Sequence, residues 1–563
     1  MRMFTFTILV LLFTNLPLLA QNIETGKEVV NYLADDKLEG RYPGTKGDKL
    51  AIDFLDQMFY DDWMGKFSFG YQQPFEIQTG KEINRNTTLK IGRDKGKLNV
   101  DYRPFIFSGE IDIKGEVVYA GQSLKETNIN LDGKWVLIYL DNEPNKTPSL
   151  RALVSEVIAA RKQKALGLLI AARHDLTDEG EFYPFKFTRS IVSVDLPVVQ
   201  LSREYLQQVI DGSNLSLRHL RKKEPGIINE KLGKLQAHVT VKFDQISAKT
   251  VNIAAYVEGT ESNDWIVVGA HYDHLGYGGK GTGSRTPERH AIHNGADDNA
   301  SGVAMVMMLA EYYKENPPES NMAFVLFGAE EMGLIGSKYF VENLPFPKAK
   351  IKAMVNYDMV GRVKDSALSI SGVKTAKEFQ SLLEQWHKKP LNLSLGGGGY
   401  SGSDQAAFYS ESIPVLFFNS GLHDDYHTPD DDIDKINFMG MEWVADLSVD
   451  LLDSLASPDF DLTFNKAKTN RGGRYSDKMK VKMGIMPDVA GTTKNGMGID
   501  GVSPDGPADK AGLKKGDAIV EIDGNEINNI YDYMHQLAEF KKGQKVKVKV
   551  RRDDKIIELE LQF

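Results

Sequence analysis

The feature that most constrains this chain is the stretch 265–302, which joins an apolar run to a polar, glycine-rich loop and then to a second apolar segment. Its first part, Ile266–Ala270, is continuously apolar, which is typical of a strand covered on both faces. His271 ends this run, and Asp297 and Asp298 stand just before the second apolar segment. This order predicts an open α/β sheet that builds a site at the carboxyl ends of its strands.

Each of these features has an ordinary structural explanation when it is taken alone. A histidine at a strand end usually satisfies local structure, and Asp297 and Asp298 have the position of acids that cap a helix. A further fragment, FVLFGAEEMGLIG, makes the structural explanation weaker. It predicts a buried strand ending in Glu330 and Glu331, and two adjacent carboxylates repel each other unless a cation or a shared proton compensates.

Two more fragments add residues of the same kind. The run IKAMVNYDMVG is an apolar strand interrupted by Asp358, and GLHDDYHTP follows another apolar strand and supplies His423 and His427. Successive strands of one sheet that each end in His, Asp or Glu indicate a metal site.

The five motifs AHYDHLG, NGADDNASG, FGAEEMGLIGS, VNYDMVG and DYHTPDD occur in this order, and together they resemble the co-catalytic zinc aminopeptidases and their relatives, metallopeptidase family 28. The resemblance implies an α/β fold with a mixed, mostly parallel central sheet flanked by helices. It also implies two zinc ions, or other divalent metals, held by His271, Asp298, Glu331, Asp358 and His427.

By the same resemblance, Asp298 bridges both metals. Glu331 and His427 complete one site, and His271 and Asp358 complete the other. The chemistry agrees with this division, because a carboxylate has two oxygens to share and imidazole suits zinc. Two cations about 3.5–4 Å apart can hold a water between them and stabilise the oxyanion that its attack creates.

Three further residues have implied catalytic roles. Glu330 is the general base, and Tyr400 falls where the family has a tyrosine facing the developing oxyanion. We expect Asp273 to accept a hydrogen bond from the far nitrogen of His271, the usual support for a metal-binding histidine. The resemblance also implies a cis peptide bond between Asp298 and Asn299.

These assignments predict a metallo-exopeptidase that removes N-terminal residues from peptides. Three alternatives stay open: a carboxypeptidase or dipeptidase of the same fold, a glutaminyl cyclase-like acyltransferase that uses one zinc, and an inactive protein-binding scaffold. The filled ligand positions and Glu330 argue against the scaffold, and the intact pair of His271 and Asp358 argues mildly against the cyclase.

The N-terminal segment 1–20 is typical of a secretory signal, with one basic residue, an apolar centre and Ala20 before the expected cleavage. Its apolar run is shorter than a membrane span requires, and we expect no span after cleavage. We therefore predict a periplasmic or secreted protein. The formal net charge of −10 and the lack of a basic tail argue against nucleic acid, and the absence of cysteine excludes disulfides.

The 563 residues predict several domains. Strands alternating with a helix from about Phe105 resemble the protease-associated (PA) domain that family members carry as an insertion. The expected division is a signal peptide at 1–20, catalytic parts at 21–104 and 236–456, a PA-like insertion at 105–235, a linker at 457–477 and a terminal domain at 478–563.

The terminal segment resembles a bacterial PDZ domain, most clearly in SPDGPADKAGLKKGDAIVEIDG. Met483, Gly484 and Ile485 stand where such domains bind a terminal carboxylate through backbone N–H groups. The resemblance implies that a protein C-terminus is a possible partner near Gly484 and Ile485, in addition to peptide substrates at the metal site.

Overall fold

The structure is a computed structural model. It describes residues 18–563 except 63, 125–128, 143–149, 177–179, 186–193, 212–215, 221–224, 226–227, 229–233, 280, 401, 468–480, 488–492, 494–495, 504, 528–532, 534–535, 538–539 and 554. Most of the expected signal segment therefore lies outside the described residues. The chain divides into two compact units, Met1–Phe75 with Lys249–Asn470, and Glu76–Ala248 with Arg471–Phe563.

The first unit is built on one eight-stranded mixed sheet. Its strand order is β1-β10-β12-β11-β13-β16-β14-β15. The four central strands, β12, β11, β13 and β16, run parallel, whereas β10 and β14 are antiparallel to their central neighbours. The strands are β1 (Gln72–Ile83), β10 (Phe243–Val257), β11 (Ser262–His271), β12 (Ser320–Phe327), β13 (Ile351–Tyr357), β14 (Ala367–Ser371), β15 (Asn392–Leu395) and β16 (Val415–Asn419).

The register of the central strands brings their carboxyl ends to the same edge. His271 pairs with Phe327, and Tyr357 pairs with Phe418. All eight residues of β12 are buried, as its continuous apolar run predicts. The residues that follow these strands therefore gather at one edge of the sheet, as the sequence led us to expect.

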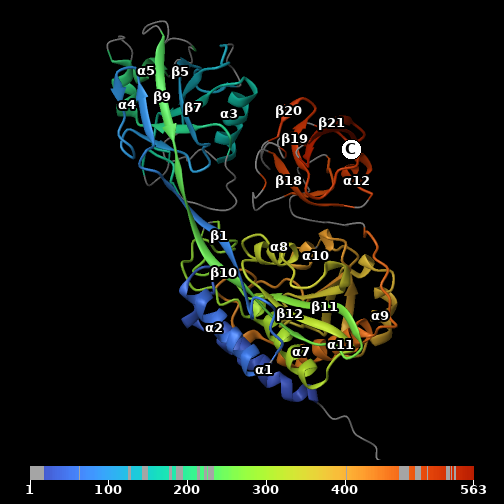
Figure 1. The fold of residues 1–563 in the computed structure, drawn as a ribbon. Helices are drawn as coiled ribbons and strands as arrows, with labels where there is room; N and C mark the ends of the chain where they lie inside the picture. The colour runs from blue at the N-terminus through green and yellow to red at the C-terminus, as the bar shows by residue number, and fades with distance from the viewer. Residues whose placement is uncertain are drawn as a thin grey trace, which may run out of the picture. The chain divides into compact units, whose positions relative to one another are not determined.

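Helices cover both faces of this sheet (Figure 1). On one face α1, α2, α7, α9 and α11 share a single apolar core with the strands. On the other face lie the shorter helices α8 and α10. None of the described helices is both long enough and apolar enough to cross a membrane. The helices are α1 (Leu18–Leu33), α2 (Lys46–Asp61), α7 (Gly302–Glu315), α8 (Ile335–Glu342), α9 (Phe379–Trp386), α10 (Gln405–Ser410) and α11 (Phe438–Ala456), with short helical turns at Asp36–Leu38, Ala296–Ser301, Lys348–Lys350, Val373–Thr375 and Ile433–Lys435.

Between α1 and α2 the chain makes a turn that carries the segment LEGRYPGT. Thr45 caps α2 by accepting the N–H of Asp48. Gly47 lies so close to Leu38 that a Cβ there would be 1.6 Å from the Leu38 carbonyl oxygen. Only glycine therefore fits at this position, and α2 begins in close contact with the turn before it.

The inserted segment forms its own eight-stranded sheet, in the order β3-β2-β9-β5-β6-β7-β8-β4. Alternate residues of β6 enter two different cores, one containing Trp135 and Leu137 and the other Val136 and Ile138. Helices cover both faces of the sheet. The elements are β2 (Thr88–Ile91), β3 (Asp94–Lys95), β4 (Tyr102–Pro104), β5 (Ile111–Tyr119), β6 (Trp135–Leu140), α3 (Leu150–Lys162), β7 (Gly167–Ala172), β8 (Val198–Leu201), α4 (Arg203–Ile210), α5 (Leu217–Leu220) and β9 (Leu235–Val241).

The inserted sheet extends beyond the limits expected at residues 105 and 235. β2 pairs with β9, and β4 pairs with β8, so residues before 105 and after 235 belong to it. These strands are only two to four residues long on the N-terminal side, too short to give a periodic signal in the sequence. The boundaries between the two compact units accordingly fall at residues 75–76 and 248–249 of the chain.

The last part of the chain forms a small antiparallel sheet, β17-β18-β19-β21-β22, with β20 paired to β19. The alternating run KVKVKV forms most of β21, with its valines buried in the core. The elements are β17 (Ile485–Pro487), β18 (Met497–Val502), α12 (Pro507–Ala511), β19 (Ala518–Ile522), β20 (Asn525–Glu526), β21 (Lys545–Arg552) and β22 (Lys555–Gln562).

The segment expected to be a linker, 457–477, is only partly described. Its first part packs on the first unit, since Thr463 donates its N–H to Glu378 and Ala467 donates its N–H to the Tyr409 hydroxyl. Residues 468–477 lie outside the described residues.

Candidate metal centre

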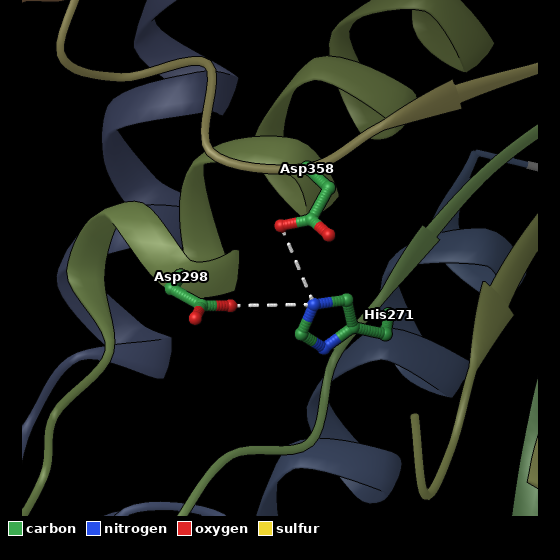
Figure 2. A group of neighbouring side chains, drawn as sticks. All are labelled: His271, Asp298 and Asp358. Carbon is green, nitrogen blue, oxygen red and sulfur yellow. Dashed lines mark ion pairs between the residues drawn. The ribbon is translucent and has the colours of Figure 1, made fainter. Parts of the chain in front are cut away.

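The first cluster at the sheet edge consists of His271, Asp298 and Asp358 (Figure 2). His271 is the last residue of β11, Asp298 lies in the turn before α7, and Asp358 follows β13. The Nε2 atom of His271 lies 3.3 Å from Asp298 Oδ1 and 3.6 Å from Asp358 Oδ1. All three residues are buried, so their polar atoms face one another instead of water.

A second cluster forms on the other side of the same aspartate. The Nε2 atom of His427 lies 3.0 Å from Asp298 Oδ2 and 3.2 Å from Glu331 Oε1. The two oxygens of Asp298 thus face two different histidines. The five residues expected to bind metal come together in this arrangement, with Asp298 at its centre.

The backbone of Asp298 is held by a buried acid from another loop. The N–H groups of Asp297 and Asp298 both donate to Asp431 Oδ2 at 3.0 Å. The other oxygen of Asp431 accepts a hydrogen bond from Arg362. The peptide bond between Asp298 and Asn299 is cis, as the resemblance implied.

The alternative expectation that Asp297 and Asp298 cap a helix is wrong. Asp297 accepts the N–H of Gly361, outside the helix, at 2.7 Å, and Asp298 faces the two histidines. The side chain that caps the start of α7 is Asn299, whose Oδ1 accepts the N–H of Gly302. The N–H groups of three residues that follow β13, Met359, Val360 and Gly361, donate to side chains of this turn.

Asp273 has a different partner from the one expected. Its carboxylate accepts the N–H groups of Glu330 and Glu331 at 2.9 and 3.3 Å. The expected hydrogen bond from His271 Nδ1 is not made by this carboxylate, because the nearer oxygen lies 3.8 Å away. Instead Nδ1 lies 3.2 Å from the backbone carbonyl oxygen of Asp273. The carboxylate therefore fixes the turn that carries the paired glutamates.

Tyr400 is buried at this side of the unit, with its ring packed edge-on against Tyr409 at a centroid distance of 4.7 Å. A Cβ on the neighbouring Gly399 would lie 2.4 Å from the Tyr409 ring, so only glycine fits before Tyr400. The expected role of Tyr400 at the oxyanion stays a prediction.

Several turns that carry the clustered side chains have left-handed backbone at residues other than glycine. The φ angle is 57° at Ala329, 61° at Met359 and 56° at His427. Such backbone costs on the order of 1–3 kcal/mol per residue and gathers at functional sites.

Electrostatics show that the centre attracts positive charge. Burial opposes ionisation of Asp298, yet hydrogen bonds from His271 and His427 hold its pKa well below the usual value. Burial disfavours the charged ring of His427, but Glu331 and Asp298 raise its pKa to about 11. Burial, together with the charge of Glu331 and against that of His271, raises the pKa of Glu330 well above its usual value. A divalent cation would satisfy the same carboxylates.

A fixed positive charge also lies beside the centre. Arg41 is fully buried, and its guanidinium donates to the backbone carbonyls of Leu33, Tyr272, Asn294 and Gly295. Burial lowers its pKa to about 10, against the raising effect of nearby acids that include Asp273 and Asp298. Two of these carbonyls belong to the turn that leads into Asp298.

Sequence reasoning missed two buried side chains close to the clusters. His274 Nδ1 lies 2.9 Å from Glu331 Oε1. Asp404 is completely buried, and burial raises the pKa of its carboxyl to about 7. His274 stands within the motif AHYDHLG, and Asp404 lies four residues after Tyr400, but neither the period nor the spacing of these segments indicates which way a side chain points.

The donor atoms fit divalent metal ions. The ligand atoms of His271, Asp298 and Asp358 all lie within 4.8 Å of one another, and His427 Nε2 lies 3.0 Å from Asp298 and 3.2 Å from Glu331. Imidazole nitrogens combined with carboxylate oxygens are the usual donors for zinc in catalytic sites. The residues present therefore suit the two zinc ions expected from the sequence.

Comparisons with known proteins match two parts of this chain to known families. Residues 252–452 match the model of peptidase family M28, and residues 481–563 match the model of the PDZ domain. The first match contains all five clustered residues, and the second contains the terminal antiparallel sheet. The PA-like assignment of the inserted sheet stays a prediction.

Curated relatives with this similarity include aminopeptidases. An aminopeptidase of Pseudomonas aeruginosa is 33% identical over 189 residues, which are 32% of this chain and 32% of that protein. Aminopeptidase YwaD of Bacillus subtilis is 29% identical over 199 residues, 33% of this chain and 39% of that protein. The match covers about a third of the length of these relatives.

Solved structures with a similar fold include an aminopeptidase from Aneurinibacillus sp. strain AM-1, with 23% identity and a TM-score of 0.46 over 79% of this chain and 96% of that one. A zinc aminopeptidase from Bacillus subtilis has 18% identity and a TM-score of 0.45, over 78% of this chain and 96% of that one.

Proposed function

We propose that this protein is an exported aminopeptidase that uses two zinc ions to remove N-terminal residues from peptides. The observation that carries the proposal is the position of Asp298. One oxygen faces His271 and Asp358, and the other faces His427, which also contacts Glu331. Two similar donor sets joined by one carboxylate are suited to two metal ions.

The residues have distinct roles in this proposal. Zinc bound at the two sets would acidify a water for attack and stabilise negative charge on the carbonyl oxygen of the substrate. Glu330 takes the proton from the attacking water and delivers it to the leaving amine. The hydroxyl of Tyr400 would donate a hydrogen bond to the developing oxyanion.

Asp273 supports this division of labour between adjacent glutamates. Its two oxygens hold the N–H groups of Glu330 and Glu331, and this fixes the turn on which both side chains stand. Glu331 faces His427 as a ligand would, whereas Glu330 is left to act on the water.

A panel of aminoacyl and N-blocked peptide substrates tests the activity. We expect turnover of substrates with a free N-terminus, its loss on exhaustive dialysis against a chelator, and its return with zinc, cobalt or manganese. Full turnover after chelation would contradict the metal mechanism. Cleavage of N-blocked substrates would favour a different exopeptidase, and one bound metal per chain by elemental analysis would favour the cyclase-like alternative.

We also propose that the PDZ domain recruits a protein C-terminus beside Gly484 and Ile485. In the described residues β17 is an edge strand paired with β18, so its free edge can accept an added strand. Gly484, which directly precedes β17, has a φ of 82°, and its carbonyl accepts the N–H of Ser503.

Removing residues after 478 tests this role. Recruitment predicts near-normal kcat on small aminoacyl substrates, because the proposed ligands all precede this point. Loss of folding or of small-substrate turnover would instead mean that the domain stabilises the catalytic unit.

Export rests on the segment 1–20. We expect the mature protein to begin at Gln21 and to appear in the periplasm or the medium. N-terminal sequencing of the purified protein checks this, and retention of residues 1–20 would contradict it.

A further inference from the structure

His274 occupies a position that the proposed five-ligand set does not explain. It is completely buried, and its backbone N–H donates to the carbonyl of Arg41. Its Nδ1 atom lies 2.9 Å from Glu331 Oε1. Its Nε2 atom is buried and has no hydrogen-bond partner within the described part of the chain.

The ring is held tightly between two parts of the centre. It stands edge-on to His427, with a centroid distance of 5.8 Å. On the other side is Gly295, where a Cβ would lie 2.5 Å from Cδ2 of His274. Gly295 opens the turn that carries Asp298, so the ring cannot rotate without moving this turn.

The direction of the hydrogen bond follows from the role of Glu331. Its Oε1 atom faces His427 as a metal ligand would, and a carboxylate must be deprotonated to bind a metal ion. An ionised carboxylate only accepts hydrogen bonds. Nδ1 of His274 therefore carries a proton and donates it.

We infer that His274 is a positioning residue for Glu331, and that it strengthens the metal site formed by Glu331 and His427 without binding metal itself. The protonated Nδ1 has no lone pair to offer an ion, and the hydrogen bond fixes the orientation of Glu331. Partners of this kind are usually worth about 10–100-fold in metal affinity. The inference rests on the proposed two-zinc function.

A substitution by asparagine distinguishes a hydrogen-bond donor from a metal ligand at position 274. Its amide nitrogen takes approximately the place of histidine Nδ1, so His274→Asn keeps a donor to Glu331 but removes the imidazole. His274→Leu removes the donor and keeps an apolar filling. His293→Leu is the matched control, because His293 is also buried, but its ring contacts Ser284 and the Ala291 carbonyl.

The experiment titrates zinc into the full-length, metal-free proteins against a chromophoric chelator and determines both dissociation constants. We expect His274→Leu to weaken one of the two sites by about 10–100-fold, and His274→Asn and His293→Leu to resemble the parent. Circular dichroism and thermal unfolding of the metal-free proteins check the fold, and if the leucine variant does not fold, His274→Asn decides.

Two results would overturn the inference. Unchanged affinities in His274→Leu would mean that the hydrogen bond does not support the metal site. A loss in His274→Asn as large as in a Glu331→Gln variant would make His274 a ligand. If the parent itself binds fewer than two zinc ions, the proposed function fails instead, so the two failures are distinguishable.

Discussion

Replacing Arg41 by lysine tests whether the N-terminal segment holds the metal centre in place. The guanidinium donates to four backbone carbonyls, those of Leu33, Tyr272, Asn294 and Gly295. Three of them lie in the loops that carry His271 and Asp298. The planar fork reaches them in different directions, whereas an ammonium places its three donors on one atom.

The expected loss of stability follows from this count. The ammonium has three donors for four carbonyls, so at least one carbonyl loses its donor in Arg41→Lys, and a buried acceptor left unsatisfied costs about 1–3 kcal/mol. The free energy of unfolding of the first unit should therefore fall by at least about 1–3 kcal/mol, although the positive charge is kept. This is a large fraction of the about 5–15 kcal/mol typical of a domain.

Hydrogen exchange of the β11 amides in the metal-free protein measures this change, because these amides report on the first unit alone. Arg289→Lys is the control, since Arg289 is half-exposed and pairs with Asp430 at the surface, where such pairs are worth at most about 1 kcal/mol. If Arg41→Lys changes the exchange free energy no more than the control does, the four hydrogen bonds do not hold the loops, and our reasoning is refuted.

Three other outcomes follow from the site and its surroundings. Glu330→Gln should keep its metal and lose about 10²–10⁴-fold in kcat, whereas Glu331→Gln should lose metal first. Elemental analysis and kinetics would show a reversed assignment if the phenotypes were exchanged. Asp298→Ala should lose both metals, and normal metal content would refute its bridging role. Burial raises the pKa of the Asp48 carboxyl from its usual value of 3.8 to about 6. The protonated carboxyl therefore stabilises the folded protein below pH 3.8, and this contribution is lost as the pH rises through about 6. Asp48→Asn should therefore gain stability relative to the parent by about 3 kcal/mol over this range, at about 1.4 kcal/mol per pKa unit. Urea unfolding at several pH values checks this gain, and a constant difference between the two proteins would contradict it.

The central strands and the chemistry at their ends could be predicted because both leave local signals. A strand buried on both faces is mostly apolar, and β11, β12 and β13 contain the buried apolar runs 266–270, 322–327 and 353–355. Acids and histidines that interrupt or end such runs are costly to bury without a partner, which marks them as a set. Parallel strands in register then place their carboxyl ends at one edge of the sheet, independently of the conformation of the loops between them.

The limits of the inserted sheet could not be predicted in the same way. Strands β2, β3 and β4 are too short to show a period, and they are recognisable only through pairing: β2 pairs with β9, β3 with β2, and β4 with β8. The hydrogen-bond partner of the Asp273 carboxylate was predicted wrongly for a similar reason. Asp273 offers two acceptors, its backbone carbonyl and its carboxylate, and the sequence does not show which of them faces His271. Only the path of the turn after β12 decides that the carboxylate accepts the N–H of Glu330.

The sequence by itself determined which residue types meet at the sheet edge, because burial and charge are properties of short segments. Only the tertiary structure decided how they are held. Arg41 bonds to the Asn294 carbonyl 253 residues away, His274 to Glu331 57 residues away, and Asp431 to the N–H of Asp298 133 residues away. Such pairs depend on how separate loops cross in space, and no periodicity along the chain records this crossing.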